Sequence, residues 1–417
     1  MRSFGAGTRP PTLAAVLDII RDQGPISRVE LASETGLTQA TMTHAVRKLM
    51  ALGYVHETGT VPSSRGKPRR LLELAAGACY MVGIQFDRFA AVGVLVDLAG
   101  RVVARRRMAG AGEREPGVVV AEFAGHVRSL LEDAGVDRSA VAGIGLATHG
   151  PQDRDAGVLL TPQPTPAWLG YPVAATLAEA TGLPVTIEND ATAAGIGIQA
   201  AKDAPASFAV VFMSAGIGAG IMLDGHPYRG TTSNGVELGH ISIDARGARC
   251  DCGNRGCLDT VAGPTAVASR ARADAGLAAR LRLDHGALPG TAPGSPSDPL
   301  SVFLAVAGAA RDGDPAAAGL VEESARMLAT ATVTLVNLFD VGRVVLAGNA
   351  FTGDVGPVYR DALQAVLERS VFMRHVHTVR AELAPDVALA PAVGAAAMVL
   401  RSLLESPPAP APQDADA

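Results

Sequence analysis

A group of cysteines in the second half of this chain sets a strong limit on its local fold. Three of the four cysteines, Cys250, Cys252 and Cys257, fall within eight residues, and His240 lies ten positions before the first of them. Three thiolates and one imidazole form the closed tetrahedral set of a structural Zn²⁺ site, which leaves no open position for a reactive water. The spacing therefore predicts one structural zinc per chain and argues against a zinc hydrolase. The alternative is a loop with free thiols.

The first 75 residues have the pattern of a winged helix-turn-helix. Apolar residues recur with a helical period over 12–23, and Ser27-x-x-Glu30 is a capping box that opens a second, short helix. A glycine turn follows, after which Thr38 caps a third helix. Two short strands then flank the Arg-, Gly- and Pro-rich segment 62–70, which predicts a basic wing.

This head is basic, whereas the rest of the chain is acidic. Residues 1–75 hold ten Arg and Lys against six Asp and Glu, and the remainder holds 26 against 35. A positive head suits a polyanion such as double-stranded DNA, and the alternative is an ordinary three-helix packing unit. The side chains expected to face DNA are Thr38, Gln39, Thr43, His44 and Arg47 from the third helix and Arg65, Lys67 and Arg69 from the wing.

Beyond the head, the pattern changes to strands that alternate with helices, and the order of elements recurs once. Two β-rich lobes of related layout that face a cleft are expected, in an α/β chain of actin-like (ribonuclease-H-like) sugar kinase fold. The predicted domains are the winged head at 1–75, the two-lobed body at 78–405 and a disordered tail at 406–417. The main strands of the body are expected at 80–86, 90–97, 102–107, 141–147, 207–213 and 343–347, with a helix near 117–134.

Two further motifs carry groups that match the hydroxyls of a sugar. Asn189 offers both a donor and an acceptor, and Asp190 and Glu237 can each accept from two hydroxyls. Glu237-Leu-Gly-His240 also joins this set to the cysteine group. Taken separately, Asn189-Asp190 reads better as a helix N-cap and Glu237 as a solvated charge. Their combination with the cysteines favours a pyranose site.

Together these motifs resemble the ROK family, which groups bacterial sugar kinases with sugar-responsive repressors. The likeness spans about 78–400, and the head resembles that of the repressor branch. The resemblance implies that Asn189, Asp190, Glu237 and His240 contact a sugar. It also implies that Asp259 takes the place of a family Glu, and that Gln163 occupies about the place of the family's sugar-contacting Asn. The motifs are Glu188-Asn-Asp-Ala191, Gly216-Ile-Gly-Ala-Gly220, Glu237-Leu-Gly-His240 and Cys-x-Cys-x4-Cys.

The phosphate-binding turns of the family's kinases are altered in this chain. Those kinases carry Asp-x-Gly-Gly-Thr, in which the glycines let backbone N–H groups approach the ATP phosphates. No phosphoryl transfer and no catalytic residue is therefore expected, although Asp190 keeps the position of a base. The altered turns are Gln85-Phe86-Asp87-Arg88-Phe89, the second phosphate turn from Ser214 with Ala215 in place of Thr, and the adenosine-side turn Ala347-Gly348-Asn349.

The sequence thus predicts a sugar-responsive DNA-binding regulator, a repressor of genes for carbohydrate uptake or catabolism. Its expected partners are a double-stranded operator, a sugar or sugar phosphate, and further copies of the chain in a homodimer or higher oligomer. No apolar run of about 18 to 20 residues and no signal-peptide core occurs, so a cytoplasmic protein without a membrane partner is expected. The alternatives are a ROK sugar kinase with a DNA-binding head, and a regulator whose body serves only dimerisation and binds no sugar.

Overall fold

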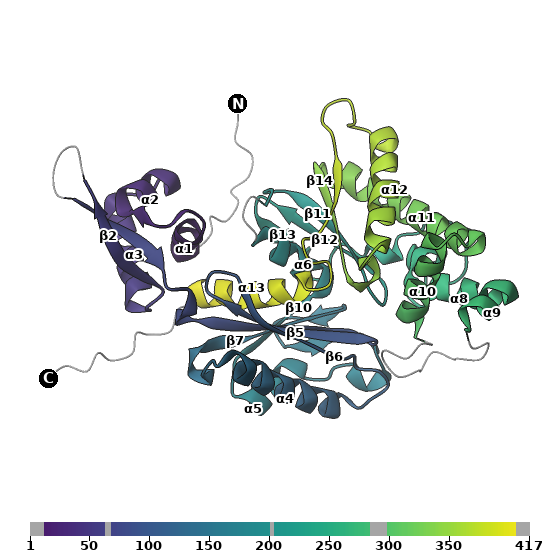
Figure 1. Cartoon of the computed structure of the whole chain (residues 1–417), viewed down its shortest axis with the longest axis horizontal. Coiled ribbons are helices and arrows are strands. Elements are labelled where there is room, and N and C mark those ends of the chain that lie inside the picture. The colour runs from purple at the N-terminus through teal and green to yellow at the C-terminus, as the bar shows by residue number, and fades with distance from the viewer. Residues whose placement is uncertain (1–11, 63–67, 201–203, 284–297, 406–417) are drawn as a thin grey trace.

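Figure 1 shows the computed structural model of the 417-residue chain, which describes residues 12–62, 68–200, 204–283 and 298–405. A small N-terminal head lies at one end of a larger body. Arg65 and Lys67 of the predicted wing, and the predicted tail at 406–417, lie outside the described residues. Within the described ranges, every helix is too short or too polar to cross a lipid bilayer.

The head has the predicted winged helix-turn-helix fold. The N–H of Ser27 donates to Glu30 Oε2 at 2.9 Å in the expected capping box, and Thr38 Oγ1 accepts from the N–H of Thr41 at 3.2 Å. The helices bury one apolar core beside an antiparallel sheet of order β1-β3-β2. The elements are α1 (Thr12–Gln23), β1 (Ile26–Ser27), α2 (Arg28–Thr35), α3 (Gln39–Ala51), β2 (Val55–Val61) and β3 (Arg69–Leu74).

Lobe I of the body is a mixed sheet of order β10-β7-β4-β5-β6. Its strands β4, β5 and β6 are antiparallel, and β7 and β10 run parallel to β4. The central strands β4 and β5 are buried along almost their whole length, as expected for strands covered on both faces. The elements are β4 (Tyr80–Phe86), β5 (Ala90–Asp97), β6 (Val102–Ala109), α4 (Pro116–Ala134), β7 (Val141–Thr148), β8 (Gln152–Asp153), β9 (Val158–Leu159), α5 (Val173–Thr181) and β10 (Val185–Asn189).

Lobe II repeats this topology with the strand order β13-β12-β11-β14-β15. Three antiparallel strands again come first, and two parallel strands follow. The shared layout confirms the predicted two-lobed α/β fold. The elements are β11 (Phe208–Met213), β12 (Ile217–Leu223), β13 (His226–Tyr228), α7 (Asp259–Ala262), α8 (Pro264–Ala273), α9 (Ala275–Leu281), α10 (Pro299–Arg311), α11 (Pro315–Phe339), β14 (Arg343–Ala347), α12 (Val355–Ser370) and β15 (Arg380–Leu383).

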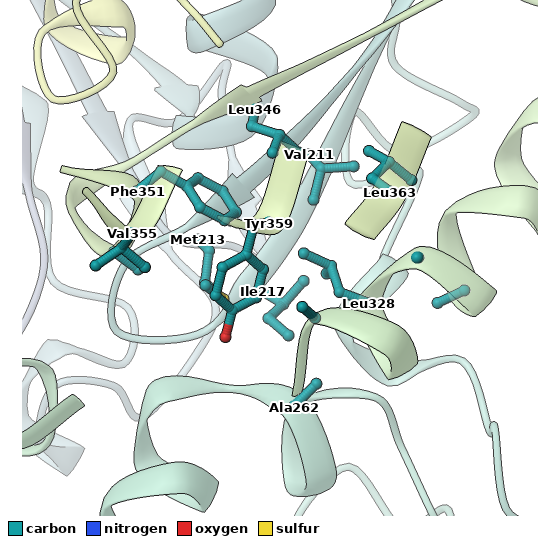
Figure 2. Close-up of a cluster of buried hydrophobic side chains, with 14 of the residues drawn as sticks. Val211, Met213, Ile217, Ala262, Leu328, Leu346, Phe351, Val355, Tyr359 and Leu363 are labelled. Carbon is teal, nitrogen blue, oxygen red and sulfur yellow. The ribbon is translucent and has the colours of Figure 1, made fainter. Parts of the chain in front are cut away.

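The core of lobe II lies between its sheet and its long helices. Figure 2 shows Val211, Met213 and Leu346 from the strands beside Tyr359 of α12. The buried hydroxyl of Tyr359 donates to Ser324 Oγ at 2.6 Å, so the ring is packed without leaving its polar atom unpaired. This core gives the turns after β11 and β14 a rigid support.

Two helices join the lobes to each other and to the head. α13 (Ala390–Glu405) packs on β4 and β7 of lobe I, α6 (Asp190–Gln199) packs on β11 and β12 of lobe II, and the two helices pack together (Figure 1). A Cβ at Gly83 would overlap the carbonyl of Ala392, and one at Gly394 would overlap that of Ala193, so glycine permits this close approach. α13 also contacts α1, and its Leu404 belongs to the apolar cluster of the head.

Candidate functional site

A cleft of about 870 Å³ lies between the two lobes, and both lobes contribute to its walls. β10 and the first turn of α6 place one group of predicted residues there. A short 3-10 helix, η4 (Leu238–His240), and the start of α7 place the others. The predicted sugar residues that line the cleft are Asn189, Asp190, Glu237, His240 and Asp259, together with Gln163.

Asn189 combines the helix-capping role with a place in the cleft. Its Oδ1 accepts from the N–H of Thr192 at 3.0 Å and caps α6, so its Nδ2 is the group that faces the ligand space. A Cβ added at Gly150 would lie 3.5 Å from Asn189 Nδ2 and 3.8 Å from Glu237 Oε1. The amide and the carboxylate therefore face the same small space, which stays open because residue 150 has no side chain.

Asp259 connects α7 to the glycine-rich turn after β11. Its Oδ1 accepts from the N–H of Ile217 at 3.0 Å, and a Cβ at Gly216 would lie 3.4 Å from the same oxygen. One carboxylate oxygen of Asp259, a residue predicted to contact the sugar, is thus already used in a hydrogen bond inside lobe II. Asp259 also lines the cleft.

The sugar end of the cleft is acidic. Burial raises the pKa of Asp190 to about 7, and the negative charges of Asp87 and Glu237 act in the same direction. Burial also raises the pKa of Glu237. Such surroundings favour ligands that donate hydrogen bonds and disfavour anions.

Asp190→Asn is expected to stabilise the ligand-free protein at pH 8 by on the order of 1 to 3 kcal/mol. Between about pH 4 and pH 7 the unfolded chain ionises this carboxyl while the folded chain keeps its proton, so stability falls as the pH rises. Asparagine removes that loss and keeps the size of the side chain. Urea unfolding at pH 5 and pH 8 should show a larger gain at pH 8, and an equal gain at both would contradict this origin.

Polar contacts between the lobes surround the site. The fully buried Glu188 pairs with Arg154 of lobe I at 3.4 Å and with Arg229 of lobe II at 2.8 Å. Asn234 of lobe II accepts from the N–H of Gln152 at 2.7 Å and donates to its carbonyl at 3.0 Å. Sequence reasoning missed these contacts because the partners are far apart in the chain and share no periodicity.

His149 is a further cleft residue that sequence reasoning missed. It follows β7 and lines the cleft, and its Nε2 is closed to solvent and has no hydrogen-bond partner among the residues that the structure describes. Burial lowers the pKa of His149, so a neutral imidazole faces the ligand space. A polar residue directly after a buried parallel strand is the signal that could have found it, because ligands bind at the carboxyl ends of such strands.

The predicted metal ligands lie together. The ligand atoms of His240, Cys250, Cys252 and Cys257 are all within 4.8 Å of one another, and none of the cysteines forms a disulfide. Gly256, with φ of 59°, turns the chain sharply between the last two ligands. The loop therefore brings together a donor set that can hold a metal ion, and three sulfurs with one imidazole nitrogen suit Zn²⁺ in a closed tetrahedral site.

α3 presents the predicted DNA-facing side chains on its exposed side. Met42, Val46 and Leu49 are buried in the head, which leaves the opposite face of the helix to solvent. An exposed polar row at the start of such a helix fits the major groove of DNA. The exposed residues are Thr38, which caps α3, Gln39, Thr43, His44 and Arg47 of α3, and Arg69 of β3.

Fold and site define a winged-helix DNA-binding head on a two-lobed body with a polar cleft and a His/Cys₃ cluster. The model of the ROK family matches residues 81–402, and a model described as winged helix-turn-helix DNA-binding matches residues 11–56. The chain belongs to the ROK family, as its motifs suggested.

Among known proteins, the chain is similar to two bacterial regulators. It is 31% identical over 255 residues to the xylose repressor of Bacillus subtilis (strain 168), a match that covers 60% of this chain but 65% of that protein. It is 25% identical over 399 residues to the DNA-binding transcriptional dual regulator NagC of Escherichia coli (strain K12), a match that covers 94% of this chain and 92% of that protein.

Solved structures from both branches of the family resemble this one. A ROK family transcriptional regulator, a homologue of the E. coli MLC protein, has a TM-score of 0.69 at 26% identity, over 95% of this chain and 99% of that one. A ROK family glucokinase from Streptomyces griseus, in complex with glucose and AMPPNP, has a TM-score of 0.64 at 25% identity, over 76% of this chain and 98% of that one.

Proposed function

We propose that this protein is a sugar-responsive repressor of transcription that controls genes for carbohydrate uptake or catabolism. The observation that carries the proposal is one helix, α13, that contacts α1 of the head and also packs on α6, whose first residue, Asp190, lines the polar cleft. The repressors among its relatives support the same function. In this proposal residues 1–75 bind the operator, residues 78–405 sense the sugar, and the protein acts in the cytoplasm.

The sugar would bind through its hydroxyls. Asn189 Nδ2 would donate to a hydroxyl oxygen, and the carboxyl groups of Asp190, Glu237 and Asp259 would accept from hydroxyls, with His240 beside them. Because these groups come from both lobes, a bound sugar favours the closed cleft. Closure would shift α13 and the head, and in a homodimer it would change how well two heads span two half-sites.

The kinase alternative keeps one supporting observation, the position of Asp190 at the sugar end of the cleft. Against it, the buried carboxylate of Asp87 stands in the turn where the family's kinases have glycine, and it would repel an ATP phosphate. We therefore propose that the chain transfers no phosphoryl group. A sensitive assay of ATP turnover with a panel of sugars tests this, and sugar-dependent ADP release would favour the kinase.

The His/Cys₃ cluster would hold one structural zinc. The ion would tie His240, next to the sugar site, to the cysteine loop that leads into Asp259 and α7. Its role would be to fix the geometry of this wall of the cleft, because four protein ligands leave no open coordination position.

Cys252→Ser is expected to reduce bound zinc from about one per chain to well below half. Sugar response should fail before DNA binding does, because the cluster lies beside the cleft and takes no part in the apolar core that holds the head. Elemental analysis of the purified protein measures the metal, and Cys79→Ser is the matched control, since Cys79 lies apart from the cluster. Undiminished zinc in Cys252→Ser would count decisively against this ligand set.

A thermal-shift screen of the full chain tests the proposed sugar site. It should cover hexoses, amino sugars, pentoses and their phosphates, followed by operator binding with and without each sugar that binds. At least one sugar is expected to raise the unfolding temperature and to change operator affinity. If no sugar binds, the body is a dimerisation module only.

A further inference from the structure

The three turns in which this chain departs from the family's kinases meet at one place. Asp87 lies in the first turn, Ser214 in the second and Asn349 in the third. Ser214 Oγ donates to Asp87 Oδ2 at 2.7 Å, and Asn349 Nδ2 donates to Ser214 Oγ at 3.4 Å. A chain of hydrogen bonds therefore crosses from the end of β4 in lobe I to the ends of β11 and β14 in lobe II.

The carboxylate of Asp87 also binds the backbone of its own turn. Its Oδ1 accepts from the N–H of Phe89 at 2.7 Å and from the N–H of Ala90 at 2.9 Å. In the family's kinases, the N–H groups of this turn approach the phosphate of a bound nucleotide. Here an anionic side chain takes those hydrogen bonds and reaches across to the second turn as well.

The hydrogen bond from Ser214 to Asp87 forms a bridge between the two lobes, and burial makes this bridge strong. Asp87 is 2% exposed and Ser214 is 1% exposed, so water does not compete for their hydrogen bond. A hydrogen bond to a charged acceptor is stronger than one between neutral groups. The bridge also lies close to the sugar site, because the charge of Asp87 is near enough to contribute to the raised pKa of Asp190.

We propose that Asp87 is a positioning residue that takes the place of a nucleotide phosphate and holds the two lobes together through Ser214. The sugar site is then complete without a nucleotide, and the same negative charge excludes one. The effect on sugar binding rests on the proposed function, whereas the bridge between the lobes stands on its own geometry.

Ser214→Ala in the full chain tests the bridge without any ligand. It removes one hydroxyl and leaves the turn of Asp87 intact. Hydrogen–deuterium exchange in peptides that cover 85–90 and 214–218 is expected to become about tenfold faster. Ser324→Ala is the matched control, because its buried hydroxyl donates to the carbonyl of Ala262 at 2.6 Å within lobe II alone. Unchanged exchange in Ser214→Ala would overturn the proposal.

Sugar affinity is a second measurement, and it distinguishes a positioning role of Asp87 from a purely structural one. With a sugar from the screen, Ser214→Ala and Asp87→Asn are each expected to raise the dissociation constant about tenfold, whereas Ser324→Ala should stay within about threefold. Asp87→Asn keeps one acceptor oxygen, which cannot serve both Ser214 and the N–H groups of Phe89 and Ala90 as the two oxygens of Asp87 do. Equal losses in Ser214→Ala and Ser324→Ala, or binding of a non-hydrolysable ATP analogue to the unaltered protein, would contradict the proposal. If no sugar binds the unaltered protein, the proposed function fails while the exchange experiment still decides the bridge.

Discussion

Replacing Thr43, His44 and Arg47 together by alanine is expected to weaken operator binding at least about a hundredfold. These side chains lie on the exposed face of α3, where a recognition helix meets base edges and phosphates. Each good base contact contributes about 1 to 3 kcal/mol of discrimination, and every lost phosphate contact weakens binding to any duplex. The core of the head should persist, because its buried residues are unchanged. Fluorescence anisotropy with operator and with unrelated duplex, each at several salt concentrations, measures the loss.

Arg128→Ala on α4 is the matched control, because it removes one exposed positive charge from the body. It should leave operator affinity and its salt dependence unchanged. Sugar binding should survive the triple substitution, since the cleft lies in the body. Full operator affinity in the triple variant would mean that α3 does not read the DNA.

What the sequence predicted correctly depends on residues that are close along the chain. The capping box of Ser27 and Glu30 joins positions three apart, and its hydrogen bonds form as the spacing indicates. The cysteine cluster is equally local, because a short loop with tight glycine turns determines where the thiols lie. The repeated order of strands was also readable, because burial on both faces leaves continuous apolar runs.

Contacts between the lobes could not be read in this way. Asp87 and Ser214 are 127 positions apart, and their hydrogen bond depends on how two sheets are placed across a cleft. In the sequence, Asp87 is visible only as the loss of a glycine and so as evidence against a kinase. The structure adds that the replacement itself makes contacts. Asn189 shows a related limit, since one amide both caps α6 and faces the cleft, so the two roles were not true alternatives.

Glu237→Ala is expected to lower sugar affinity by about fivefold to more than a hundredfold. The variant removes an acceptor that faces the same space as Asn189 Nδ2, and it leaves one or more sugar hydroxyls without their protein partner. Operator binding in the absence of sugar should be unchanged. Titration calorimetry with a sugar from the screen measures the affinity, and Glu179→Ala on the exposed side of α5 is the control for loss of one carboxylate.

The same variant tests whether the cleft controls the head. A sugar changes operator affinity only if it binds the DNA-competent and DNA-incompetent states with different affinity, so sugar and operator must alter each other's binding constants by the same factor. In the unaltered protein, titrating each ligand with the other absent and then saturating should give equal factors. In Glu237→Ala, the response of DNA binding should vanish at sugar concentrations that saturate the unaltered protein. Because α13 packs on lobe I and on α6 and also contacts α1, it is the element through which closure would reach the DNA. Independence of the two constants for every sugar that binds would break this link and leave the cleft without a regulatory role.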